Sequence, residues 1–296
     1  MREQLEAAAA RRSPLLTAKT NAVRLIDGAG DGLPGLFLES FDKRRLLSTT
    51  TRSIPPAVSE WLRDSGLPCY WKLLDPHEKE SPVYLTGPEA AGPFIIRENG
   101  ISYEISFLSG YSQGIFLDQR DNRAEVRRRM APGMKLLNTF AYTGAFSVAA
   151  AIVGAQTTTL DLSQTYLDWA KRNLSHNFID PAAHHFCKGD TFHWLRRFAK
   201  QGRRFDGIVL DPPTFSRDEK GKVFRVENDF GELAALAAEI LAPCGWLLCC
   251  TNFRGMTPAE FERQIRSKLP RPMTPRHAPM PEDFTDRAYL KSVWLE

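Results

Sequence analysis

The chain has 296 residues, of which 43% are hydrophobic and 25% are charged, and its formal net charge is +4. A chain of this length and composition can bury a large core in one or two domains. No apolar run approaches the roughly 20 residues that are needed to cross a bilayer, which excludes a helical membrane protein.

Five cysteines without C-x-x-C spacing favour reduced thiols and argue against structural zinc. We therefore expect no bound metal. The first residues include acidic side chains and lack a long apolar core, so they do not resemble a signal peptide. These features predict a cytoplasmic protein, and the mild positive charge is compatible with RNA without being diagnostic of it.

The N-terminal part of the chain alternates short apolar runs with turn-forming residues. Residues 1–20 predict a polar helix and a connector that contains Pro14. Residues 21–110 predict a small α+β domain, a candidate for RNA contact. Its expected elements are strands at 21–26, 36–41, 45–51 and 69–74, a helix at 55–64, and a hairpin over 94–107 around Asn99-Gly100.

Two stretches of this domain are expected to be connections. The glycine-rich stretch 27–35 is followed by neither a helix nor a Lys-Ser/Thr pair. A hairpin connection is therefore favoured over a phosphate loop. Residues 75–93 hold four prolines and mixed charges, which predicts a loop.

A basic segment precedes the second half of the chain. Arg120, Arg123 and Arg127 are three and four residues apart, so a helix would place them on one face. Such a face is either solvated or binds phosphate groups.

The stretch from Met134 to Asp161 has the pattern of a strand, a turn, a helix and a second strand. We expect the strand at 135–140, the turn at 141–144, the helix at 145–153 and the next strand at 156–160. Ligands of α/β sheets bind where parallel strands end and helices begin. A carboxylate after the second strand, Asp161, can accept hydrogen bonds from a ribose diol, which predicts a nucleoside-cofactor site.

The glycines of the turn indicate which cofactor binds. A dinucleotide fold uses G-x-G-x-x-G, but Asn138 to Gly144 contain one glycine, beside Phe140 and Tyr142. S-adenosylmethionine carries no phosphate, and aromatic walls suit its sulfonium. A nicotinamide-dependent oxidoreductase is the alternative from another class.

Three acidic residues follow successive predicted strands. Asp161, Asp190 and Asp211 come after strands at 156–160, 184–187 and 205–210. In a parallel sheet these strand ends share one edge, so the carboxylates would line one crevice. Helix capping or turn formation is the structural alternative for each of them.

Several motifs together resemble a known family. They are F-L-D-Q-R-x-N-R, N-x-F-A-Y-T-G, D-x-S-x-x-Y-L-x-W-A-x-R-N-L and F-D-x-I-x-x-D-P-P-T-F-S. The chain resembles the bacterial class I, S-adenosylmethionine-dependent methyltransferases of large-subunit ribosomal RNA. The resemblance implies an α/β fold with a Rossmann-like methyltransferase domain over residues 111–296. It also implies ribosomal RNA or a pre-ribosomal particle as partner, while the N-terminal PUA domain of some relatives is missing.

The resemblance also implies roles for individual residues. Expected to bind the cofactor are Gln119, Asn138, Phe140, Tyr142, Thr143, Gly144, Asp161, Leu162, Ser163, Asp190 and Thr191. Expected to contact the substrate are Arg120, Arg123, Pro212, Phe215 and Arg254. Expected to act in catalysis are Asp211, which begins the Asp-Pro-Pro motif, and Asn252.

The target atom depends on the segment T-N-F-R-G at 251–255. Cytosine C5 must be activated by a thiolate that adds to C6. The family that the chain resembles includes cytosine-C5 and guanine-N7 methyltransferases. Alignment with the cytosine-C5 relatives places Asn252 at the position of their nucleophilic cysteine, so this chemistry would require Cys250 instead. The segment resembles the N-N-x-R-G of guanine-N7 relatives, which need no nucleophile, and guanine N7 is therefore preferred. A non-catalytic RNA-binding protein is the remaining alternative.

Overall fold

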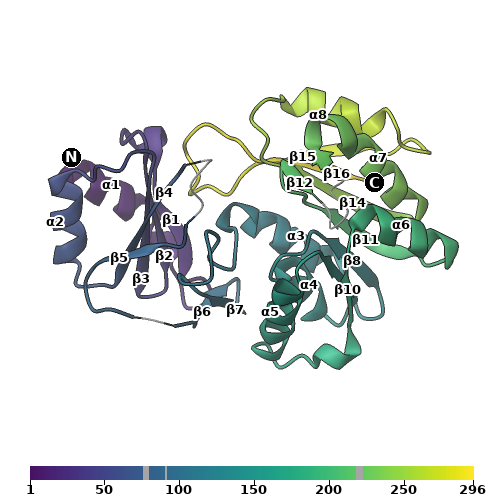
Figure 1. The fold of residues 1–296 in the computed structure, drawn as a ribbon, viewed down its shortest axis with the longest axis horizontal. Helices are drawn as coiled ribbons and strands as arrows, with labels where there is room; N and C mark the ends of the chain where they lie inside the picture. The colour runs from purple at the N-terminus through teal and green to yellow at the C-terminus, as the bar shows by residue number, and fades with distance from the viewer. Residues whose placement is uncertain (76–79, 91, 218–222) are drawn as a thin grey trace. The chain divides into compact units, whose positions relative to one another are not determined.

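The computed structural model describes residues 1–75, 80–90, 92–217 and 223–296. The chain forms two compact units (Figure 1). The N-terminal unit comprises Met1–Arg120 and Pro281–Ala288, and the second comprises Asp121–Met280 and Tyr289–Glu296. This division lies ten residues beyond the expected boundary at 110, and it places a segment from near the C-terminus in the N-terminal unit.

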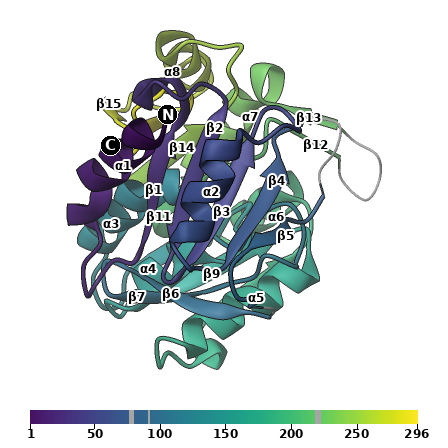
Figure 2. The same ribbon diagram turned by 90° about the vertical axis from the view of Figure 1, so that its left-hand side faces the viewer.

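The N-terminal unit is built on a five-stranded sheet of order β1-β2-β3-β4-β5. Its helices α1 and α2 pack on the same face, where Leu5, Val58 and Leu62 join one apolar cluster. Helix α2 lies across that face in Figure 2. The elements are α1 (Arg2–Arg12), β1 (Ala22–Asp27), β2 (Leu36–Phe41), β3 (Arg44–Thr49), α2 (Pro56–Asp64), β4 (Cys69–Leu73), β5 (Val83–Thr86), β6 (Phe94–Glu98) and β7 (Ile101–Ile105).

These elements confirm the predicted α+β character and the hairpin of β6 and β7 around Asn99 and Gly100. The loop expected at 75–93 was wrong over Val83–Thr86, which forms an edge strand antiparallel to β4. Four residues between prolines give too short an apolar pattern to recognise, because pairing with β4 supplies the order. Residues 76–79 and 91 of that expected loop lie outside the described residues.

The segment Pro281–Ala288 is held in the N-terminal unit by a buried carboxylate. Asp283 is fully buried, and its two oxygens accept hydrogen bonds from Arg120 Nη1 at 3.0 Å and Nη2 at 2.5 Å. The backbone N–H of Arg24 donates to the same carboxylate at 2.9 Å. Arg12 Nε donates to the Asp283 carbonyl at 2.9 Å. These bonds explain why the segment leaves the second unit, to which its flanking residues belong.

The second unit contains a seven-stranded sheet of order β10-β9-β8-β11-β14-β16-β15. Strands β10, β9, β8, β11 and β14 are parallel, and β16 is antiparallel to both of its neighbours. Its strands are β8 (Lys135–Thr139), β9 (Gln156–Asp161), β10 (His185–Lys188), β11 (Phe205–Leu210), β14 (Leu241–Thr251), β15 (Pro275–Ala278) and β16 (Lys291–Leu295). A short hairpin of β12 (Phe215–Arg217) and β13 (Val223–Arg225) lies outside this sheet.

Helices cover both faces of this sheet. Along β14, Leu247 and Cys249 pack with α6, α7 and α8, whereas Leu248 and Cys250 pack with α3 and α4 on the opposite face. The helices are α3 (Arg120–Arg129), α4 (Ala145–Ala151), α5 (Gln164–Ser175), α6 (Thr191–Lys200), α7 (Val226–Glu239) and α8 (Pro258–Arg266). A parallel sheet between two helical layers is a Rossmann-like α/β fold, as predicted.

The strand order places a ligand crevice at a definite point. The chain runs outward from β8 through β9 to β10, then returns to β11 on the other side of β8. In open α/β sheets, ligands bind at the carboxyl ends of the strands where the order reverses. Among the described residues, no helix has the length and apolar character of a membrane span.

Candidate cofactor site

The turn after β8 has an unusual backbone. Phe140 and Tyr142 both have positive φ, 50° and 49°. Aromatic residues rarely adopt this left-handed region, and each such residue costs of order 1–3 kcal/mol that interactions with its surroundings must offset. Two hydrogen bonds hold the turn in this conformation. The Tyr142 N–H donates to Asp161 Oδ2 at 2.8 Å, and the Ala141 N–H donates to the Leu160 carbonyl at 3.1 Å.

Gly144 ends this turn at a point where a side chain would clash. Its φ is +76°, and a Cβ atom there would lie 2.5 Å from Ala170 Cβ. Helix α4 therefore approaches α5 through a glycine and an alanine. The single glycine of the motif serves this close packing as well as the turn.

Asp161 connects the turn to the next helix. Its Oδ1 accepts the Ser163 N–H at 2.9 Å, while Oδ2 holds Tyr142. Burial raises the pKa of the Asp161 carboxyl, and the backbone hydrogen bonds from Ser163, Tyr142 and Leu162 oppose that shift. A carboxylate has about four acceptor positions, so three backbone donors leave about one position for a further donor.

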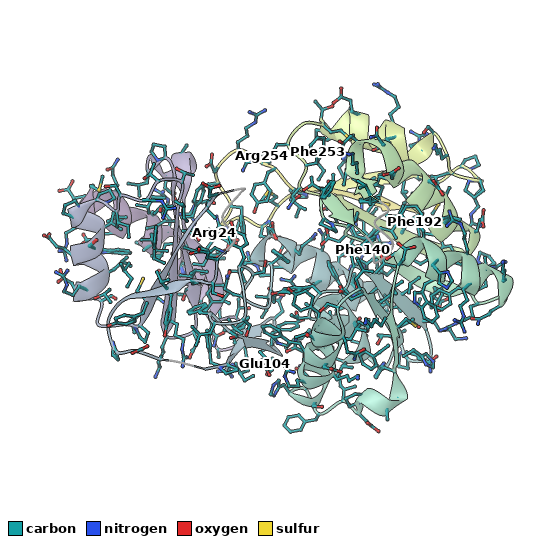
Figure 3. All side chains as sticks on the ribbon, in the orientation of Figure 1. Arg24, Glu104, Phe140, Phe192, Phe253 and Arg254 are labelled. Carbon is teal, nitrogen blue, oxygen red and sulfur yellow. The ribbon has the colours of Figure 1, made fainter. Side chains whose placement is uncertain are left out.

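A pocket opens beside Asp161. Three phenylalanine rings form its apolar wall: the Phe224 centroid is 6.1 Å from that of Phe140 and 6.0 Å from that of Phe192. Figure 3 shows Phe140 and Phe192 close together in the second unit. The pocket is lined by Phe140, Asp161, Leu162, Asp190, Thr191, Phe192, Val223, Phe224, Asp229 and Glu232.

The pocket contains five of the predicted cofactor residues and five that the sequence did not indicate. Phe140, Asp161, Leu162, Asp190 and Thr191 were predicted to bind the cofactor. The unpredicted residues come from the start of α6, from β13 and from α7. Their tertiary placement gives no motif, although an aromatic residue directly after Asp190-Thr191 was a usable signal for Phe192.

Asp190 has the capping role that was considered as its alternative, and Ser163 also caps a helix. The Asp190 side chain accepts the His193 N–H at 2.8 Å and begins α6. The Ser163 hydroxyl accepts the Tyr166 N–H at 3.4 Å and begins α5. The cap uses Asp190 Oδ1 and leaves Oδ2 for a ligand. Capping and ligand binding are therefore compatible.

Two predicted residues lie beneath the turn. Asn138 and Thr143 are both buried. Asn138 Nδ2 donates to Ser147 Oγ at 3.0 Å, and Asn173 Nδ2 donates to the Thr143 carbonyl at 2.9 Å. These bonds fix the turn from below, so both residues shape the site through the backbone.

Asp211 follows β11 at the same sheet edge but is not among the residues that line this pocket. The strand order explains the separation, because β8 lies between β11 and β9. Pro212 is buried, and the Phe215 ring is 50% exposed. Phe215 is therefore not a core residue.

Asn252 and Cys250 lie in different surroundings at the end of β14. Asn252 follows the strand and is exposed, whereas Cys250 is fully buried. The Cys250 thiol lies 3.6 Å from Ser292 Oγ and 4.0 Å from Asn122 Nδ2. Arg254 is exposed, with its guanidinium 5.4 Å from the Tyr289 ring centroid, and Figure 3 labels it in the loop beside Phe253.

The expected basic face of α3 is corrected by the structure. Arg120 and Arg123 are buried, not solvated. Asp283, far away in sequence, supplies the counter-charge for Arg120, and the Arg123 guanidinium lies 5.9 Å from the Phe146 ring centroid. Gln119 is likewise buried in the N-terminal unit. A buried, ion-paired Arg120 has no free charge for a phosphate.

Comparison with known proteins identifies the family. A family model described as S-adenosylmethionine-dependent methyltransferase matches residues 76–286. The chain belongs to this family. S-adenosylmethionine is therefore the cofactor of this methyltransferase.

Named relatives and a solved structure agree with this assignment. Ribosomal RNA large subunit methyltransferase K of Neisseria meningitidis serogroup B is 41% identical over 56% of this chain, and the match spans 47% of that protein. Ribosomal RNA large subunit methyltransferase I of Aeromonas salmonicida is 32% identical over 86% of this chain and 67% of its own. The crystal structure of SMU.776 complexed with SAH has a TM-score of 0.91 at 30% identity, covering 100% of this chain and 80% of that chain.

The pocket of the methyltransferase fits this cofactor chemically. Its acidic residues, Asp161, Asp190 and Asp229, suit a ligand that carries a sulfonium and would repel a pyrophosphate, whereas Glu232 is ion-paired with Arg196. The family match therefore overturns the nicotinamide alternative. Within residues 1–75, 80–90, 92–217 and 223–296, no three His, Cys, Asp or Glu side chains gather as a metal site requires.

Proposed function

We propose that this methyltransferase transfers a methyl group to guanine N7 in large-subunit ribosomal RNA, either free or in a pre-ribosomal particle. Two relatives named as ribosomal RNA large subunit methyltransferases, K and I, support the RNA class. Their names do not specify an atom. The choice of N7 depends on Cys250 near the end of β14 and on Asn252 just after it.

The single observation that carries this choice is the burial of Cys250. Methylation at cytosine C5 needs a thiolate that can reach C6 of the base. Cys250 is fully buried on the sheet face covered by α3 and α4, and it contacts Ser292. The exposed residue at the end of this strand is Asn252, whose amide cannot add to C6.

Guanine N7 requires less from the protein. S-adenosylmethionine supplies an electrophilic methyl group, and N7 has an available lone pair. Catalysis then depends on aligning the base with the methyl carbon and on stabilising positive charge that grows on the purine. We assign charge stabilisation to Asp211, hydrogen bonding of the base edge to Asn252, and stacking on the flipped base to Phe215.

The cofactor-facing roles follow the pocket. Asp161 accepts hydrogen bonds from the ribose hydroxyls, and Leu162 and Phe192 contact the adenine. Asp190 and Thr191 lie next to the exocyclic amine of the adenine. The turn at 140–144 surrounds the methionine part. Arg254, which is exposed, contacts the RNA substrate, whereas Pro212 is buried.

Nucleoside mass spectrometry of ribosomal RNA tests the proposal. A deletion strain is expected to lose one 7-methylguanosine, which expression of the wild-type chain restores. Cys250→Ser should restore it as well, because the thiol has no part in the chemistry, whereas Asn252→Ala should not. Loss of 5-methylcytidine from the deletion strain, with no rescue by Cys250→Ser, would establish cytosine C5 as the target. Unchanged modification would leave a non-catalytic RNA-binding role.

A further inference from the structure

The hairpin of β12 and β13 has two faces with different chemistry. Across the hairpin, Phe215 pairs with Arg225, and the neighbouring pair contains Phe224. Directly opposite residues share a face, and successive residues of a strand point to opposite faces. Phe215 and Arg225 are therefore on one face, and Phe224 is on the other.

The inner face contributes to the cofactor pocket. Phe224 is buried and packs between Phe140 and Phe192, which come from the turn after β8 and from α6. Val223 lines the same pocket. The backbone of β13 is fixed there, because the Arg225 N–H donates to Asp229 Oδ2 at 2.7 Å.

The outer face presents an aromatic ring beside a cation. The Arg225 guanidinium lies 5.4 Å from the centroid of the half-exposed Phe215 ring. The Arg225 side chain is 55% exposed, and its ion pair with Glu227 is long, at 3.9 Å. An exposed guanidinium next to an aromatic ring is the combination that binds a nucleobase and its phosphate.

Helix stability does not explain the cation. Arg225 is the N-cap residue of α7 and makes no side-chain capping bond. A positive charge at a helix N-terminus opposes the helix dipole, which favours acidic residues there. The acidic residues of the first turn, Glu227 and Asp229, already serve that purpose.

We propose that Arg225 is an RNA-contacting residue which holds a phosphate beside the base on Phe215, while Phe224, on the other face of the same hairpin, contacts the cofactor. This inference rests on the proposed function, since it takes RNA as the substrate. One short element then places the base-binding surface directly behind the cofactor pocket. The two faces make separable predictions.

Binding measurements on the full chain test the outer face. The probe is an unmodified transcript of large-subunit ribosomal RNA, titrated at several salt concentrations. Arg225→Ala should weaken binding about fivefold or more and reduce the salt slope by about one, because one phosphate contact is lost. Arg225→Lys should keep the slope. Arg204→Ala is the matched control. Arg204 is exposed and precedes β11, at the end of the strand opposite to Asp211.

Calorimetry with S-adenosylmethionine tests the inner face. Phe224→Ala should weaken cofactor binding about tenfold, and Phe224→Leu should weaken it less while preserving the packing of the wall. Arg225→Ala should leave cofactor affinity within twofold of wild type. Phe178→Ala, which removes a fully exposed ring, is the control for loss of an aromatic residue.

The outcomes distinguish this inference from the function on which it rests. A wild-type chain that binds neither the transcript nor a pre-ribosomal particle would overturn the RNA substrate and, with it, the role of Arg225. A wild-type chain that binds, with Arg225→Ala showing the same affinity and salt slope, would overturn the role of Arg225 alone. A folded Phe224→Leu variant with full cofactor affinity, together with the same result for Phe224→Ala, would overturn the assignment of Phe224.

Discussion

Replacing Asp161 by Asn separates its structural role from its role in binding. The carboxylate accepts backbone N–H groups, among them those of Tyr142 at 2.8 Å and Ser163 at 2.9 Å. Asparagine has the same shape but one acceptor oxygen, so one of these donors would face an amide NH₂. Losing one hydrogen bond to a charged acceptor costs about 1.5–3 kcal/mol.

The burial of Asp161 reduces the net loss of stability. Burial raises the pKa of this carboxyl, so the charged form is unfavourable in the folded state, and a neutral amide removes that penalty. The two effects oppose each other, and we expect the free energy of unfolding to fall by only about 1 kcal/mol. The cofactor gains no such compensation. Losing a charge-assisted bond to the ribose should weaken binding by about 1.5–3 kcal/mol, roughly 10- to 150-fold.

Calorimetric titration with S-adenosylmethionine and denaturant unfolding measure the two quantities. Asp180→Asn is the matched control, because Asp180 also accepts a backbone N–H, at 2.9 Å, but is exposed and outside the pocket. A folded Asp161→Asn variant that binds the cofactor within twofold of wild type would refute the assignment to the ribose.

The pH dependence gives a second test of the same residue. The folded pKa of Asp161 lies above its ordinary value of 3.8. Its contribution to stability is therefore present at low pH and is lost as pH rises through the folded pKa. Binding follows the opposite direction, because the ribose needs the charged acceptor. Wild-type affinity should fall toward that of Asp161→Asn as the solution is acidified through the raised pKa.

Three further substitutions probe the scaffold by chemical denaturation. Asp283→Asn should destabilise the chain by about 3–5 kcal/mol, since it leaves a buried arginine without its counter-charge. Gly144→Ala should destabilise it more than Gly133→Ala, because both glycines have positive φ but only the Gly144 Cβ would meet Ala170, at 2.5 Å. Hydrogen bonds from two arginines lower the pKa of Glu125 to about 2, so Glu125→Gln should cost about 1 kcal/mol at neutral pH, with the difference lost as pH falls from 4.5 through about 2.

The elements around the candidate cofactor site could be predicted from sequence because their information is local. A buried strand, a turn with one glycine and a small-residue helix occur within 28 residues, and β8 and β9 follow the expected ranges closely. Asp161 is placed by the end of its own strand. No distant residue has to be known in order to locate it.

Long-range partners explain what could not be predicted. The spacing of Arg120 and Arg123 correctly indicated one helical face. The carboxylate that pairs with the buried Arg120 belongs to Asp283, 163 residues later. Phe224 belongs to the pocket only because the hairpin after Asp211 folds back over the end of β8. The spacing of residues along a helix or strand indicates which face a residue occupies. It does not indicate which distant residues cover that face.

The backbone of the turn indicates why aromatic residues occur where glycine would be easier. Phe140 and Tyr142 have φ values that glycine adopts without strain. Both rings nevertheless make contacts that glycine could not, since the Phe140 ring lines the cofactor pocket and the Tyr142 ring packs edge to face on Tyr166 at a centroid distance of 4.6 Å. The Asp161 carboxylate holds the strained backbone by accepting the Tyr142 N–H. The same side chain therefore supports the turn and faces the ligand, which couples the shape of the pocket to the residue expected to recognise the ribose.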